Sequence, residues 1–167
     1  MGVRRMVVMK KRVMVVMDEI CSSRARHTMM WALTHVVNKG DILTLVNVVS
    51  PYDNGDSSFV PELLNSLGSL CKASRPEVEV EVLVIQGSKL PTILTQVKKL
   101  EVSVLVLTKR NPSLFSFCGL LRSRDDEFVE QCINNAECLT LAITKQNKGV
   151  GGYLISTRWH KNFWLLA

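Results

Sequence analysis

Short apolar runs alternate with segments whose apolar residues recur at helical spacing, and this alternation constrains the fold most strongly. The run 12–17 is short, apolar and rich in Val and Met, which predicts a buried strand. Residues 24–38 then carry apolar side chains at intervals of three and four, which predicts a helix. The same alternation continues along the chain. The predicted strands are 12–17, 41–49, 78–85, 102–107 and 138–143, and the predicted helices are 24–38, 61–74, 87–100 and 125–135.

The order strand–helix–strand, repeated to the fifth strand, predicts right-handed crossovers and a parallel sheet covered on both faces. We therefore expect one doubly wound α/β domain of the flavodoxin or Rossmann-like type. Its five-stranded parallel sheet should have the strand order 3-2-1-4-5. The domain should span residues 11–145, after a basic N-terminal segment 1–10. The aromatic tail 146–167 is too apolar to be exposed to water, so it should pack on the domain or on a partner.

Composition narrows the class of protein only modestly. The net charge of +6 permits binding of nucleotides, nucleic acid or anionic lipid without selecting among them. Five cysteines without CxxC spacing or a Cys/His cluster suggest reduced thiols and no metal site, hence a cytoplasmic protein, with the nucleus as the alternative. No apolar run has the length of a membrane span.

Four short motifs in order resemble the universal stress protein family, part of the adenine nucleotide alpha hydrolase-like group. They are a strand ending at Asp18 before a helix with Trp31-Ala-Leu33, Gly40-Asp41 leading into the second strand, Gly87 before the third helix, and Asn135-Ala136 with Cys138 before the fifth strand. The resemblance covers roughly residues 10–145, and Glu137 and Leu139 replace the two prolines of the last motif. The tail looks like that of a plant branch of the family.

The ligand crevice of a doubly wound sheet lies where the strand order reverses, here between the first and fourth strands. The segment after the fourth strand is therefore the expected phosphate loop. By resemblance, ATP-binding members of the family carry three glycines there, at the positions of Thr108, Asn111 and Leu121 in this chain. Pro112 removes a further backbone donor. The glycine-based ATP loop of the family therefore does not carry over to this sequence.

Cations and hydroxyl groups take the place of the glycines, and they could contact an anion directly. The alternative is that they are solvated around a loop packed by its Phe and Leu side chains. By resemblance, Asp18 would contact the adenine end of a nucleotide; the alternative is a turn or helix-capping residue. The predicted nucleotide-binding residues are Asp18, Thr108, Lys109, Arg110, Asn111, Arg122 and Ser123, with Arg124 as a further cation.

Two functions remain open. The leading one, implied by the resemblance, is a stress-response protein that is not an enzyme, has weak or lost ATP binding, and acts as a homodimer through protein partners. The fifth strand would be its dimerisation edge and the aromatic tail a partner surface. The alternative is a true ATP- or AMP-binding module with a basic phosphate loop. Nucleic-acid binding is permitted by the charge but not favoured.

A nucleotide hydrolase is a third hypothesis, and it is not favoured because the sequence has no obvious general base beside the loop and no Walker lysine context. Asp125 and Asp126 could hold a metal, but adjacent acids at a helix start are ordinarily charges that complement the helix dipole. Cys118 lies among cations that could activate its thiol, although a small buried apolar side chain is the simpler role.

Overall fold

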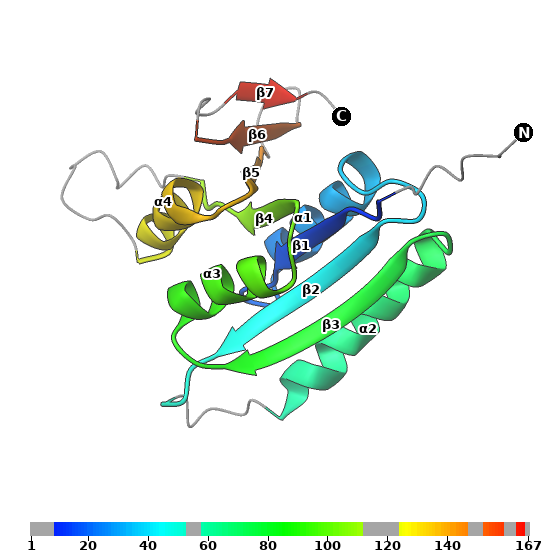
Figure 1. Ribbon diagram of the computed structural model, residues 1–167, viewed down its shortest axis with the longest axis horizontal. Helices are drawn as coiled ribbons and strands as arrows, with labels where there is room; N and C mark the ends of the chain where they lie inside the picture. Colours follow the sequence, from blue (N-terminus) through cyan, green and yellow to red (C-terminus); the bar gives the residue numbers. More distant parts are fainter. Residues whose placement is uncertain (1–8, 53–57, 112–123, 147–151, 159–162, 166–167) are drawn as a thin grey trace, which may run out of the picture.

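The computed structural model describes residues 9–52, 58–111, 124–146, 152–158 and 163–165 (Figure 1). Helices and strands alternate through the first nine elements, as the sequence pattern predicts. The strands are β1 Arg12–Val16, β2 Ile42–Val49, β3 Glu79–Gln86, β4 Val104–Thr108, β5 Leu139–Lys145, β6 Tyr153–Ser156 and β7 Phe163–Leu165. The helices are α1 Ser23–His35, α2 Phe59–Ser74, α3 Lys89–Lys99 and α4 Arg124–Asn135. No described helix is long and apolar enough to cross a bilayer.

All described strands form one sheet in the order β3-β2-β1-β4-β5-β6-β7. The strands β1 to β5 are mutually parallel and follow the predicted order 3-2-1-4-5, so the doubly wound fold is confirmed. The predicted count of five strands is wrong. The tail adds β6 and β7, both antiparallel to their neighbours, at the β5 side of the sheet. Strand β6 buries apolar side chains and satisfies its backbone groups by pairing with β5, and β7 pairs in turn with β6.

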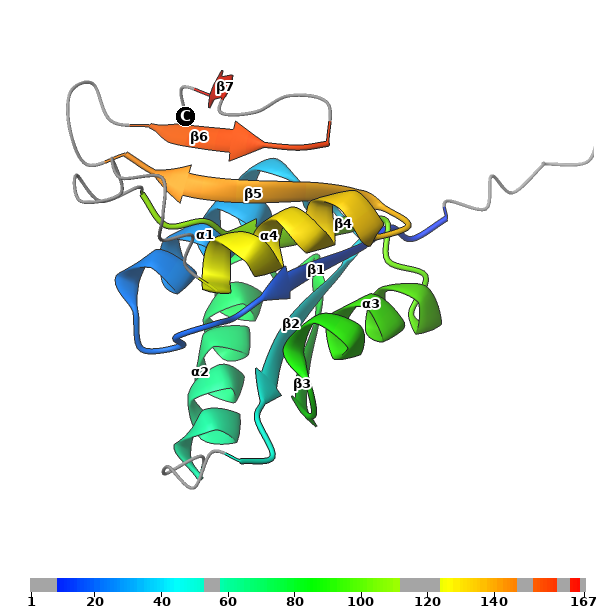
Figure 2. The same cartoon turned by 90° about the vertical axis from the view of Figure 1, so that its left-hand side faces the viewer.

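Helices α1 and α2 lie on one face of the sheet and α3 and α4 on the other (Figure 2). An apolar layer lies between the sheet and each pair of helices. Val13, Val15 and Met17 face α1 and α2, whereas Met14 and Val16 face α3 and α4, because side chains alternate along a strand. All five are at most 1% exposed. Burial on both faces explains why β1 reads as a continuous apolar run rather than an alternating one.

Helix α1 begins at the polar turn that follows β1. The Ser22 hydroxyl accepts a hydrogen bond from the backbone N–H of Ala25 at 3.2 Å, so Ser22 is the N-cap of this helix. The turn itself places Glu19 at a positive φ of 45°. This geometry directs the chain from the carboxyl end of β1 onto the α1 and α2 face of the sheet.

Strand β6 packs the start of the tail against the domain. Its residues pair with β5 from Ala142↔Ser156 to Lys145↔Tyr153. The Tyr153 ring lies 6.2 Å from the ring of Trp31 in α1, and Ile155 joins the core on that face. The outer edge of β5, predicted to pair with a second subunit, is therefore occupied by β6 of the same chain.

We predict that Ile155→Ala lowers the free energy of unfolding by about 2–5 kcal/mol, because Ile155 is buried and its loss leaves a cavity. Leu139→Ala is the matched control, since Leu139 on β5 is 43% exposed, and it should change stability by less than about 1 kcal/mol. Urea unfolding followed by circular dichroism measures both. Equal effects of the two substitutions would contradict a structural role for β6.

Candidate functional site

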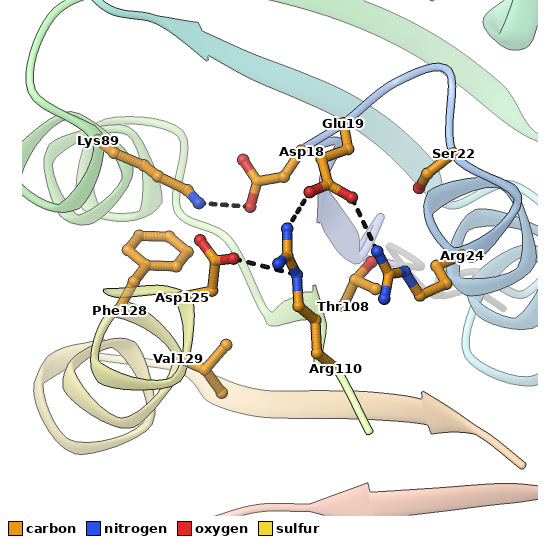
Figure 3. A pocket seen from close by; sticks show the side chains of 10 residues that line it. All are labelled: Asp18, Glu19, Ser22, Arg24, Lys89, Thr108, Arg110, Asp125, Phe128 and Val129. Atoms are coloured by element: carbon orange, nitrogen blue, oxygen red, sulfur yellow. Dashed lines mark hydrogen bonds and ion pairs between the residues drawn. The ribbon is translucent and has the colours of Figure 1, made fainter. Parts of the chain in front are cut away.

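A crevice lies at the carboxyl ends of β1 and β4, where the strand order reverses (Figure 3). Asp18 and Glu19 reach it from the turn after β1, and Thr108 and Arg110 from the end of β4. The starts of three helices surround it. They contribute Ser22 and Arg24 beside α1, Lys89 of α3, and Asp125, Phe128 and Val129 of α4.

Four ion pairs cross this crevice. Lys89 Nζ lies 2.7 Å from Asp18 Oδ2, and Arg24 contacts Glu19 at 3.1 Å. Arg110 binds two carboxylates, those of Glu19 and of Asp125, the latter at 3.1 Å from its Nε. We call these six side chains the crevice ion-pair cluster: Asp18, Glu19, Asp125, Arg24, Lys89 and Arg110. Its three acids and three bases balance in charge.

Local structure explains why these charges meet. Lys89 is the first residue of α3, and Asp125 lies in the first turn of α4, where an acidic side chain complements the helix dipole. The Lys89 ammonium also lies 4.1 Å from the centre of the Phe128 ring, a cation–π contact that steadies it toward Asp18.

Burial raises the pKa of Asp18 above its usual range, Lys89 opposes this rise, and the carboxylates of Asp125 and Glu19 add to it. Asp18 is not the cap of α1, because Ser22 has that role. The ammonium of Lys89 is thus the partner that favours the charged form of this carboxyl group.

The cluster leaves a cavity of only about 40 Å³ between its side chains. A wider cavity of about 530 Å³ lies alongside, at the carboxyl ends of β1, β2 and the start of α3. Asp18, Glu19 and Lys89 border both cavities. The wider one is completed by Asn47, Val48, Ser50, Pro51, Tyr52, Gly87 and Ser88. The Asn47 side chain donates to the backbone oxygen of Met17 at 2.6 Å, which ties β2 to the end of β1.

The predicted site residues fall into three groups. Asp18, Thr108 and Arg110 meet in the crevice. Lys109 and Asn111 line a different cavity, on the α1 side of the sheet, where Thr108 also contributes. Arg122 and Ser123 lie outside the described residues, as do Leu121, Pro112 and Cys118. Arg124 is the first residue of α4 and is exposed.

Sequence reasoning missed the roles of Glu19, Lys89 and Asp125. Their signal is weak, since an acid after a strand and charges at helix starts are common on any surface. Their positions are the signal that could have found them. Glu19 follows β1, and Lys89 and Asp125 lie in the first turns of α3 and α4, whose starts surround the crevice. The sequence allows Asp125 to hold a metal or to complement the helix dipole, and the structure pairs it with Arg110.

Two of the described cysteines, Cys71 and Cys132, are buried in the core. Burial raises the pKa of the Cys71 thiol to about 11 and that of Cys132 to about 12, so both stay protonated near neutral pH. Among the described residues, no group of three His, Cys, Asp or Glu side chains is arranged to hold a metal ion.

The chain belongs to the universal stress protein family, whose model matches residues 9–143. It is similar in structure to a universal stress protein solved in complex with cAMP, with a TM-score of 0.61 and 12% identity over 79% of this chain and 95% of that one. It is also similar to an Arabidopsis thaliana family protein with AMP bound, with a TM-score of 0.55 and 18% identity over 82% of this chain and 93% of that one.

A universal stress protein from Archaeoglobus fulgidus gives a TM-score of 0.60 at 17% identity, over 79% of this chain and 92% of that one. At such identities these likenesses show the shared fold. A search of curated proteins found no significant match.

We predict that Lys89→Met raises the pKa of Asp18 further, because the charged form loses its ion pair while its burial remains. A carboxyl group with a raised pKa favours folding below its unfolded pKa and loses that contribution as pH rises through the folded pKa. The stability of Lys89→Met should therefore decline over a pH range that extends higher than in the wild type.

Carbon-13 NMR titration of the Asp18 carboxyl measures this shift. Lys98→Met is the control, since Lys98 forms only an exposed pair with Glu137 at 3.8 Å. An unchanged Asp18 titration in Lys89→Met would show that this ion pair does not form in solution.

Proposed function

We propose that this protein is a nonenzymatic, stress-response-associated member of its family in which ATP binding is weak or lost. The crevice ion-pair cluster is the observation that carries this proposal. In a phosphate site, cations and backbone N–H groups must be available to the ligand. Here Arg110, the cation best placed in the crevice, already binds the carboxylates of Glu19 and Asp125.

Electrostatics argue against a triphosphate in this crevice. A triphosphate would have to displace two carboxylates from one guanidinium and then lie beside them as like charges. The glycines that let backbone N–H groups close around phosphates are also absent from Thr108 and Asn111. Neither the charge nor the backbone of the described crevice is suited to ATP.

A nucleoside monophosphate is the second candidate ligand, and the wide cavity beside Asp18 favours it. At about 530 Å³ this open cavity lies in the size range of small-molecule sites. Polar groups of Asp18, Asn47 and Ser88 line it and could recognise a base or a ribose. Two structurally similar proteins were crystallised with cAMP or AMP, which supports the same chemistry here.

Self-association would act through a sheet edge other than that of β5. The strand β7 ends the described sheet, and an edge strand offers unpaired backbone groups to another chain. We therefore propose a homodimer, with protein partners that contact the tail. The described cysteines are free thiols, which supports a cytoplasmic or nuclear location.

We predict that calorimetry on refolded, nucleotide-free protein detects little or no ATP binding, and that Asp125→Asn increases ATP affinity about fivefold or more. The substitution removes a negative charge from the crevice and releases the Nε of Arg110. Asp126→Asn is the matched control, since it changes the same residue type in the same helical turn but does not line the crevice. Tight ATP binding by the wild type would disprove the proposal.

Native mass spectrometry of the protein as purified tests the ligand and the assembly together. We predict a mass of two chains, and for the second candidate an added mass of AMP that Asp18→Asn reduces, because Asp18 borders the wide cavity. The matched control is Glu62→Gln, a carboxylate in the first turn of α2 that does not border this cavity. A bare monomer would contradict both the dimer and the bound monophosphate.

A further inference from the structure

The crevice and the wide cavity beside it share one border. The small cavity of about 40 Å³ and the wide one of about 530 Å³ are both lined by Asp18, Glu19 and Lys89. Two of these residues bind each other, since Lys89 Nζ lies 2.7 Å from Asp18 Oδ2. Figure 3 shows the two side chains pointing toward one another, Asp18 from the turn after β1 and Lys89 from the start of α3. The ion pair therefore spans the boundary between the two cavities.

We propose that this ion pair is a proton-operated gate: when Asp18 takes up a proton, Lys89 is released and the small cavity joins the wide one. We call the pair the Asp18–Lys89 gate. It goes beyond the proposed function, because it states when the two cavities are connected, whichever ligand enters them. The proton comes from solvent and neutralises the carboxylate, so no other reactant is needed.

Asp18 depends on one side chain for its charge partner. Among the described residues, the carboxylate of Asp18 forms its hydrogen bond and its ion pair with Lys89. Asp41 differs, because its carboxylate also accepts hydrogen bonds from the backbone N–H groups of Lys11 and Asn38, at 3.2 and 2.8 Å. A backbone donor stays in place when a side chain moves. The contact that holds Asp18 is thus one that a single protonation can break.

The surroundings of Asp18 favour uptake of a proton. Burial raises the pKa of Asp18, Lys89 opposes this rise, and the carboxylates of Asp125 and Glu19 add to it. Asp18 therefore binds a proton at a higher pH than an exposed aspartate does. The titratable and charged groups around it, from the turn after β1, the segment after β2, the end of β4 and helices α1, α3 and α4, are Glu19, Tyr52, Arg110, Arg24, Lys89, Asp125 and Cys132.

A neutral Asp18 leaves Lys89 without a charged partner of its own. The two remaining carboxylates of the crevice ion-pair cluster, Glu19 and Asp125, are both bound by Arg110. The neutral carboxyl group of Asp18 can still accept a hydrogen bond, but bonds without the carboxylate charge are about half as strong. The cluster then holds three cations and two carboxylates, so like charges repel the ammonium group of Lys89 toward solvent.

The movement needs only a side chain. Lys89 is the first residue of α3, so the helix fixes its backbone, and its side chain is 31% exposed. Its ammonium group also lies 4.1 Å from the centre of the Phe128 ring, and this cation–π contact steadies the closed position. Rotation about the bonds of the lysine side chain carries the ammonium group away from both partners and into the wide cavity, which is open to solvent.

Opening the gate uncovers an apolar wall. The small cavity is lined by Phe128 and Val129 of α4, which are 8% and 2% exposed. With Lys89 withdrawn, a small molecule in the wide cavity can reach these side chains, and burial of apolar surface favours that contact. At low pH the joined cavity therefore accepts a ligand with an apolar group, whereas at higher pH the ion pair excludes it.

The experiment follows both side chains by NMR as the pH is lowered from about 7.5 to about 4, a range that ends near the ordinary pKa of aspartate. We expect the carboxyl carbon of Asp18 and the ε-carbon of Lys89 to titrate with one common midpoint, because one proton moves both. In Asp18→Asn the Lys89 signal should hold its low-pH position at every pH. Asp126→Asn, the same change at a residue of α4 that lines neither cavity, should titrate as the wild type does.

The neutral nitroxide TEMPOL, which is too large for the small cavity alone, tests in the same samples whether the cavities join. Its paramagnetic broadening of the Val129 methyl signals should rise about threefold or more on acidification and in Asp18→Asn, because the open state becomes the main one. The methyl signals of Ile93, buried in the same apolar layer, should be unaffected. Separate midpoints for Asp18 and Lys89, or Val129 signals that stay protected both at low pH and in Asp18→Asn, would overturn the gate.

Discussion

The strand β1 is hydrogen-bonded along both edges, to β2 on one side and to β4 on the other, and everything at the candidate sites depends on these pairings. After β1 the chain turns to the face covered by α1, and after β4 it continues toward α4 on the opposite face. Two neighbouring strands whose connections diverge leave a crevice between them. Because β1 and β4 are parallel, the acids after β1 and the cations after β4 must meet there.

The alternation of side chains at the end of β4 divides this region into two sites of opposite character. Consecutive residues of an extended chain point to opposite faces, so Arg110 enters the crevice while Lys109 reaches the α1 side. Thr108 borders both cavities. Three acids neutralise the cations of the crevice, whereas the described lining of the cavity on the α1 side contains none. Net charge alone could not reveal this division, because it sums the charges of the whole chain and does not say where they lie.

The sequence predicts the sheet order and the faces of the strands well, because apolar runs such as 12–17 reflect burial on both faces directly. It fails at the tail, where four residues, Tyr153–Ser156, are too few for periodicity to separate a strand from a packed loop. It also fails at the crevice. Lys89 and Asp18 meet only through the tertiary fold, so grouping Lys109 with Arg110 as phosphate contacts was natural from sequence and is not how the structure arranges them.

The free energies of the ion pairs determine which ligands the crevice can still bind. Arg110, Glu19 and Asp125 are each more than 40% exposed, and ion pairs of such exposure typically contribute about 0–1 kcal/mol each. A ligand can therefore separate them at modest cost, and the crevice is not sealed. The larger obstacle is that the three carboxylates stay near any phosphate that enters, and repulsion grows with each ligand charge. Asp125 does not border the wide cavity, so a monophosphate placed there would lie apart from this carboxylate. A triphosphate that reached Arg110 would lie beside Asp125, because Arg110 and Asp125 form an ion pair. The crevice ion-pair cluster therefore disfavours a triphosphate more strongly than a ligand of lower charge, and this difference is the physical basis of the proposed weak ATP binding.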